Sequence, residues 1–138
     1  MQTETTRKLF TVDDYYRMAE VGILKPTDRV ELIDREIVTM TPIGTRHNAS
    51  VNRGMRALVR AVGDDAIVQS QGSVRLDYYS EPQPDLVLLR PRSDFYAARH
   101  AGPGDILLII EIAESSIHYD RDGKARIYAA AGVPEYWL

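Results

Sequence analysis

The sequence predicts an α/β domain in which a mixed central sheet is flanked by helices. Helical and extended patterns alternate along the chain, which is typical of α/β and α+β domains. Residues 106 to 110 are all aliphatic, as expected of a strand that is covered on both faces at the centre of such a sheet. No repeat, low-complexity tract or linker divides the chain, so we expect one domain.

The N-terminal part of the chain contains a predicted helix and a predicted hairpin. Thr11 is a suitable N-cap for a short helix that Gly22 ends. Residues 30 to 33 and 37 to 40 are two short runs rich in aliphatic residues that flank the polar turn at residues 34 to 36, which predicts a hairpin.

The remaining elements follow in an alternating order. The clearest helix covers roughly residues 46 to 62, where the apolar side chains recur at helical spacing. Residues 93 to 104 form a surface connection. The other predicted elements are strands at residues 66 to 68, 74 to 78, 86 to 89, 106 to 112 and 135 to 138, and a helix from about residue 121 to 131 that Gly132 ends.

The composition is that of a soluble globular domain. The 138 residues carry a net charge of −3, which neither indicates nor excludes nucleic-acid binding. The absence of cysteine excludes disulfides, thiolate zinc sites and cysteine nucleophiles. No signal-peptide pattern or membrane-length apolar run is present, so we expect a cytoplasmic protein with no membrane partner. We expect residues 1 to 9 to be a loose leader and residues 10 to 138 to form the domain.

Two acidic residues at strand ends are candidates for chemistry. Asp85 precedes one aliphatic run and Glu111 follows the next. A buried carboxylate needs a cation partner, a metal or open water, and Lys124 in the last predicted helix can fold back over both acids. Two carboxylates, with the carbonyl of Ile112 as a further ligand, suit magnesium, and a lysine can orient the attacking water or stabilise a phosphate.

Other readings of the same residues remain open. The two acids can be ordinary strand-end residues, with Lys124 exposed and paired with Asp120 one helical turn earlier. The acids can also be a glycosidase pair, although the single tryptophan, Trp137, gives no sign of a sugar site.

Several segments resemble the Uma2 family of the PD-(D/E)xK nuclease superfamily. The matching segments, which span nearly the whole chain, are residues 10–15, 30–38, His47 after a proline-containing turn, 84–87, 110–116, 120–124 with Tyr128, and 132–137. The resemblance implies a restriction-endonuclease-like fold. It also implies hydrolysis of nucleic-acid phosphodiester bonds, those of DNA, with Mg²⁺ or Mn²⁺ as cofactor.

The resemblance also assigns roles to residues. It implies Asp85 and Glu111 as metal ligands. The superfamily places a lysine two residues after the second acid, where this chain has Ala113, and the family's lysine corresponds to Lys124 in the next helix. Glu31 matches an acid that supports the metal site or positions water, although an edge-strand acid facing water would fit the same pattern.

The chain departs from the family pattern in two places. Arg35 stands where the family usually has glycine, which disfavours the tightest hairpin turns. The family pattern continues beyond Trp137, so we expect an incomplete sheet edge, which a homodimer suited to double-strand cleavage would cover. A non-catalytic interaction module on the nuclease scaffold remains the alternative function, because fold does not guarantee chemistry.

One helix face is a candidate for nucleic-acid contact. Arginines cluster on one side of the helix at residues 46 to 62, and His47 at its start suits proton transfer or phosphate contact. A solvated amphipathic face is the alternative. The arginines are Arg46, Arg53, Arg56 and Arg60.

Overall fold

The computed structural model describes residues 4–40, 42–112 and 123–138, and within these ranges the strands form two sheets. Strands β1 (Val30–Ile33) and β2 (Glu36–Thr39) form an antiparallel hairpin. The second sheet has the order β3-β4-β5-β6. Its strands are β3 (Ile67–Ser70), β4 (Leu86–Leu89), β5 (Ile106–Ile110) and β6 (Tyr136–Trp137). Because β6 runs parallel to β5 and the other pairs are antiparallel, this sheet is mixed, as predicted.

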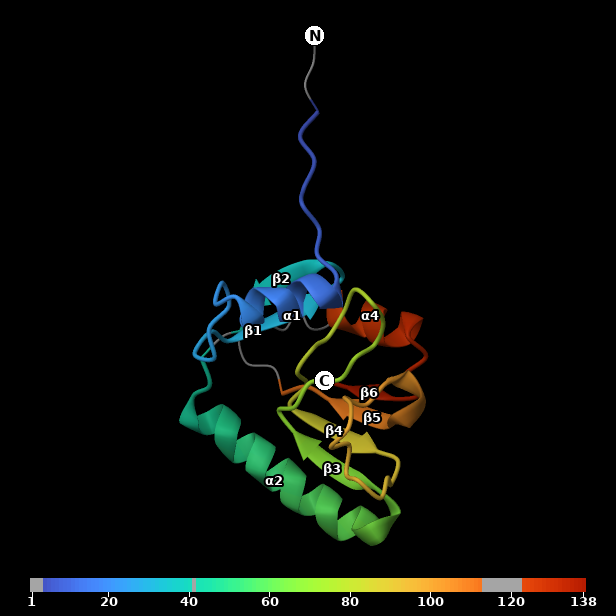
Figure 1. Ribbon diagram of the computed structural model, residues 1–138. Coiled ribbons are helices and arrows are strands. Elements are labelled where there is room, and N and C mark those ends of the chain that lie inside the picture. The colour runs from blue at the N-terminus through green and yellow to red at the C-terminus, as the bar shows by residue number, and fades with distance from the viewer. Residues whose placement is uncertain (1–3, 41, 113–122) are drawn as a thin grey trace.

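Three α-helices are described. They are α1 (Val12–Glu20), α2 (Thr45–Val62) and α4 (Ala125–Ala130), and short 3-10 turns lie at η1 (Gly63–Asp65) and η2 (Pro103–Asp105). Figure 1 shows α1 and the hairpin together at one end of the four-stranded sheet, with α2 running alongside that sheet. None of the helices within the described ranges has the length and apolar character needed to cross a bilayer.

The ends of α1 and α2 and the C-terminal end of α4 lie close to the predicted positions. Thr11 caps α1 in a reciprocal capping box with Asp14, which satisfies two backbone donors at the helix start. Gly132 follows α4 with φ +82°, a conformation that glycine adopts at little cost. The start predicted near residue 121 falls outside the described residues, and the described helix begins after its N-cap, Lys124.

Helices pack on both faces of the four-stranded sheet. Successive residues of β4 point to opposite faces. On one face Leu86 approaches α2 so closely that a Cβ at Gly54 would lie 2.8 Å from Leu86 Cδ1. On the other face Val87 belongs to the buried cluster that contains Tyr128 of α4. This arrangement confirms the predicted α/β architecture.

The prediction of a strand at residues 74 to 78 is wrong. Val74 and Leu76 are buried, which produces the alternating pattern of a strand. However, the backbone amides of this segment donate to three separate partners, so no continuous ladder forms. The bonds run from Val74 to Pro82, from Arg75 to Ala101 and from Leu76 to Ser80.

The hairpin turn is tighter than predicted. Ile33 pairs with Glu36, so the turn consists of Asp34 and Arg35 alone, with φ angles of +44° and +72°. Arg35 is held in this left-handed conformation by Tyr79, whose carbonyl accepts its N–H at 2.9 Å and whose ring lies 4.1 Å from its guanidinium. Tertiary contacts therefore overcome the local preference for glycine at this position.

Candidate active site

Three residues from distant parts of the chain form a buried ion cluster. The Lys124 ammonium donates to Glu31 Oε1 at 2.9 Å and to Glu111 Oε1 at 3.2 Å. Glu31 lies on β1, Glu111 directly follows β5, and Lys124 is the N-cap of α4. All three residues are at most 5% exposed. The alternative readings expected an exposed Lys124 and a water-facing Glu31, but both side chains are buried. Asp120, the partner expected for an exposed Lys124, lies outside the described residues.

Two further donors hold the carboxylates of this cluster. The Tyr128 hydroxyl donates to Glu111 Oε1 at 3.0 Å, and the Gln83 amide donates to Glu31 Oε1 at 2.8 Å. Both hydrogen bonds to Glu111 fall on Oε1. Among the described residues, no hydrogen bond is made to Oε2 of Glu111, which leaves that oxygen available for a ligand.

Asp85 lies at the same end of the sheet and is held separately. Leu86 pairs with Ile110, so the residues before β4 and after β5 are neighbours. The Ile112 amide donates to Asp85 Oδ2 at 2.7 Å, and His47 Nε2 lies 2.9 Å from Asp85 Oδ1. With Asp85 ionised, the imidazole is the donor, because a carboxylate only accepts.

The electrostatics of the cluster favour an additional cation. Burial raises the pKa of Glu111 to about 8, and the negative charges of Asp85 and Glu31 raise it further, against the opposing effect of Lys124. Lys124 contacts Glu31 and Glu111, whereas Asp85 is held by His47 and the Ile112 amide. A divalent cation bound beside these carboxylates would oppose the rise in the pKa of Glu111.

The donor set fits a hard divalent cation of the magnesium type. Asp85 and Glu111 would supply two carboxylate ligands to such a cation, and Mg²⁺ usually takes one or two, with water and substrate phosphate completing its shell. Within the described ranges, no group of three or more His, Cys, Asp or Glu side chains is arranged to enclose a metal.

Comparison with known proteins identifies the family. The family model Uma2, described as "Putative restriction endonuclease", matches residues 12–138. The chain belongs to the Uma2 family. A search of curated proteins found no match. The family membership agrees with the resemblance seen in the sequence and with the mixed α/β fold.

The Uma2 chain carries the predicted arginine face on α2. Its four arginines are exposed, and none forms an ion pair with any residue that the structure describes. They are Arg46, Arg53, Arg56 and Arg60. This face belongs to the same helix as His47, which contacts Asp85, so α2 connects a basic surface with the carboxylates. Val59 on the same helix is also about half exposed.

Sequence reasoning missed two contributors to the Uma2 site. Tyr128 was noted in the matching segments without a role, yet its hydroxyl contacts Glu111. Its spacing of four residues from Lys124, one helical turn, was the available signal, because both side chains then face the same way. The second contributor is the backbone amide of Gln83, which donates to Glu31. Sequence patterns concern side chains, so they could not predict this contact.

Proposed function

We propose that this Uma2 chain is a Mg²⁺- or Mn²⁺-dependent endonuclease that hydrolyses phosphodiester bonds of DNA. The observation that carries the proposal is the meeting of Lys124 with Glu111 and Glu31 at the sheet end where Asp85 also lies. Two acids and a lysine are the groups that metal-assisted phosphodiester cleavage requires.

In this proposal, Asp85 and Glu111 hold the cation, with the backbone carbonyl of Ile112 as a further ligand. A bound divalent cation lowers the pKa of its water and polarises the phosphate. Lys124 orients the attacking water or stabilises the negative charge that develops on the phosphate. Glu31 acts through Lys124, since it accepts a hydrogen bond from the same ammonium group that contacts Glu111.

His47 acts as a positioning residue in this scheme. Its hydrogen bond to one oxygen of Asp85, with the Ile112 amide on the other, limits rotation of the carboxylate. Fixing a ligand in this way lowers the cost of ordering it when the cation binds.

The arginine face of α2 supports nucleic acid as the substrate. Four exposed guanidinium groups on one helix face offer charge-assisted hydrogen bonds to successive phosphates. A homodimer, which would present two sites to the two strands of a duplex, stays a prediction.

The test combines metal binding with cleavage. Asp85→Asn and Glu111→Gln keep side-chain volume and hydrogen-bond acceptors, so Lys124 and Tyr128 retain a partner at position 111. Calorimetric titration of MnCl₂ should give heat with the wild type and little with either variant. Incubation of plasmid DNA with Mg²⁺ or Mn²⁺ should give cleavage by the wild type alone.

The control variant is Glu135→Gln, which removes an exposed carboxylate of the same kind. It should bind manganese and cleave like the wild type. Equal cleavage by wild type, Asp85→Asn and Glu111→Gln would reveal a contaminating nuclease or a wrong site. DNA binding without metal heat or cleavage would favour the non-catalytic module.

A further inference from the structure

A second hollow, of about 630 Å³, opens between α1 and the connection that precedes β5. Aromatic rings and basic side chains line it together. The residues that matter for binding are Tyr16, Arg75, Tyr96, Arg99 and His100. None of them belongs to the candidate active site, so the hollow offers separate chemistry.

Two rings in the hollow provide flat surfaces. Tyr16 and His100 are nearly parallel, with an interplanar angle of 24° and ring centroids 6.4 Å apart. This separation lies toward the wide end of the range for aromatic pairs, about 4.5–7 Å. His100 is exposed, and its ring makes no hydrogen bond to any described residue. A planar ligand can therefore stack on its face.

An arginine beside these rings retains unused donors. Arg75 donates through Nε to Glu81 Oε1 at 3.0 Å, and its guanidinium lies 5.3 Å from the centre of the Tyr16 ring. Its side chain is 46% exposed, and it also forms a side-chain hydrogen bond with Tyr16, so only part of its five N–H donors is used. Glu81 is 2% exposed, so the arginine and not the carboxylate faces the solvent.

A second arginine is held rigidly across the hollow. Arg99 donates to Asp105 Oδ2 at 2.7 Å, and its guanidinium lies 5.8 Å from the centre of the Tyr96 ring. Both arginines are thus placed against tyrosine rings before any ligand arrives. Such preorganisation reduces the entropy lost on binding.

We propose that this hollow is a nucleotide-binding site, in which a base stacks on the Tyr16–His100 pair and a phosphate accepts hydrogen bonds from Arg75. Stacking on aromatic rings tolerates any base, and arginine donors select the phosphate. The proposal needs neither the metal nor hydrolysis, so it stands apart from the nuclease activity.

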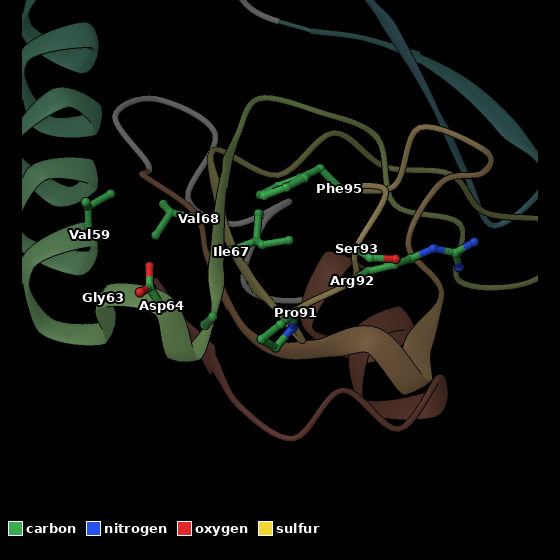
Figure 2. Close-up of a pocket in the computed structure, with 10 residues that line it drawn as sticks. Val59, Gly63, Asp64, Ile67, Val68, Pro91, Arg92, Ser93 and Phe95 are labelled. Atoms are coloured by element: carbon green, nitrogen blue, oxygen red, sulfur yellow. The ribbon is translucent and has the colours of Figure 1, made fainter.

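Another hollow of similar size suits this chemistry less well. It has a volume of about 660 Å³ at the end of α2 and is lined mainly by apolar side chains such as Val59, Ile67 and Phe95. Figure 2 shows the Arg92 guanidinium pointing away from Val59 and Val68. Its lining includes one arginine, Arg92, against two in the hollow beside α1, so it offers fewer donors to a phosphate.

The segment from Glu81 to Asp85 connects the nucleotide site with the candidate active site. Glu81 accepts hydrogen bonds from Tyr16 and Arg75 on the side of the hollow. Two residues later, the Gln83 amide donates to Glu31 in the ion cluster. A nucleotide in the hollow would therefore contact side chains held by the segment that leads into Asp85, a proposed metal ligand.

The test is an NMR titration of the full chain with dAMP in the presence of EDTA. We expect saturable shifts of the amide resonances of Tyr96, Arg99, His100 and Gly102. His100→Ala removes a stacking face without removing a side-chain hydrogen bond, and it should weaken binding about tenfold. Arg75→Gln should weaken dAMP more than deoxyadenosine, because it removes the phosphate donors.

The matched control is Arg35→Ala, which removes an arginine from a tyrosine ring outside the hollow and should leave binding unchanged. Inorganic phosphate that shifts the same amides with the affinity of dAMP would overturn the proposal in favour of a simple anion site. Absence of shifts, or shifts insensitive to both variants at the hollow, would also overturn it.

Two further titrations complete the test. The first distinguishes a nucleotide within a strand from a free nucleotide, and the second distinguishes this inference from the proposed nuclease function. A short single-stranded oligodeoxynucleotide should bind more tightly than dAMP if the site takes a nucleotide within a strand, and no better if it takes a free nucleotide. Glu111→Gln should bind dAMP like the wild type. Loss of cleavage therefore leaves this inference intact, and loss of dAMP binding leaves the nuclease proposal intact.

Discussion

His47 Nε2 lies 2.9 Å from Asp85 Oδ1, a contact that joins the first turn of α2 to the residue before β4. Both side chains are largely buried, with exposed fractions of 15% and 13%. The helix that carries the arginine face is thereby connected directly to a proposed metal ligand.

His47→Ala should lower the rate of DNA cleavage about 10- to 100-fold, the usual cost of losing a partner of a metal ligand. His47→Gln should restore part of the rate, because its amide can still donate to Asp85. Single-turnover cleavage of a labelled duplex measures both variants. Equal rates for alanine and glutamine would show that the hydrogen bond does not position Asp85.

Substitution of two arginines on α2 should weaken DNA binding in a salt-dependent way. Each lost phosphate contact reduces the slope of log K against log salt by about 0.9, so Arg53→Gln/Arg56→Gln should reduce it by roughly 2. Fluorescence anisotropy at several salt concentrations provides the slope. Arg17→Gln/Arg29→Gln removes the same charge elsewhere and should leave the slope nearly unchanged; an equal reduction in both pairs would argue against a localised face.

Lys124→Met should destabilise the fold by about 3–5 kcal/mol, because it leaves two buried carboxylates without their shared cation. Urea denaturation measures the change in the free energy of unfolding. The double variant Lys124→Met/Glu31→Gln should be less destabilised than Lys124→Met alone. Lys25→Met, at an exposed position, is the control, and a similar loss there would show that the effect is unspecific.

Two substitutions of Arg35 in the hairpin turn should separate the cost of backbone strain from the loss of the contact with Tyr79. Arg35→Val places a β-branched residue at φ +72° and should cost about 1–2 kcal/mol of stability. Arg35→Gly relieves the strain but loses the contact with Tyr79, so its stability should stay within about 1 kcal/mol of the wild type. Thermal unfolding of the two variants gives the comparison, and equal losses would mean that the Tyr79 contact dominates.

The pair of Arg99 and Asp105 predicts a loss of stability in acid. The hydrogen bond from Arg99 lowers the pKa of Asp105 below its usual value of 3.8. Its stabilising contribution is therefore present above about pH 4 and is lost as the pH falls through the lowered pKa. The difference in melting temperature between wild type and Asp105→Asn should shrink from pH 5 to pH 2.5. For Asp64→Asn, whose carboxylate forms no ion pair among the described residues, we expect no such convergence.

Local patterns predicted much of the fold. The strand before Glu111 was predicted from its aliphatic run and α2 from its amphipathic spacing. Each pattern lies within a single element, and the structure confirms both elements. Asp85 and Glu111 are brought to the same sheet end because their strands are neighbours. The acids' roles as metal ligands stay a prediction.

The features that sequence reasoning missed depend on contacts between distant segments. Residues 74 to 78 alternate like a strand, but their backbone partners come from separate places in the chain. Arg35 adopts a left-handed conformation because Tyr79 holds it. The hollow between α1 and the connection before β5 exists only once Tyr16 and His100 have been brought together.

The distance in sequence between Glu31 and Lys124 has a consequence for how the protein is made. The two residues are 93 positions apart, so Glu31 leaves the ribosome long before its cation partner. Until α4 has been synthesised, burial of Glu31 and Glu111 would leave both charges uncompensated. We therefore expect the hairpin to dock only after α4 has been synthesised, so that Glu31 and Glu111 stay hydrated until Lys124 is available.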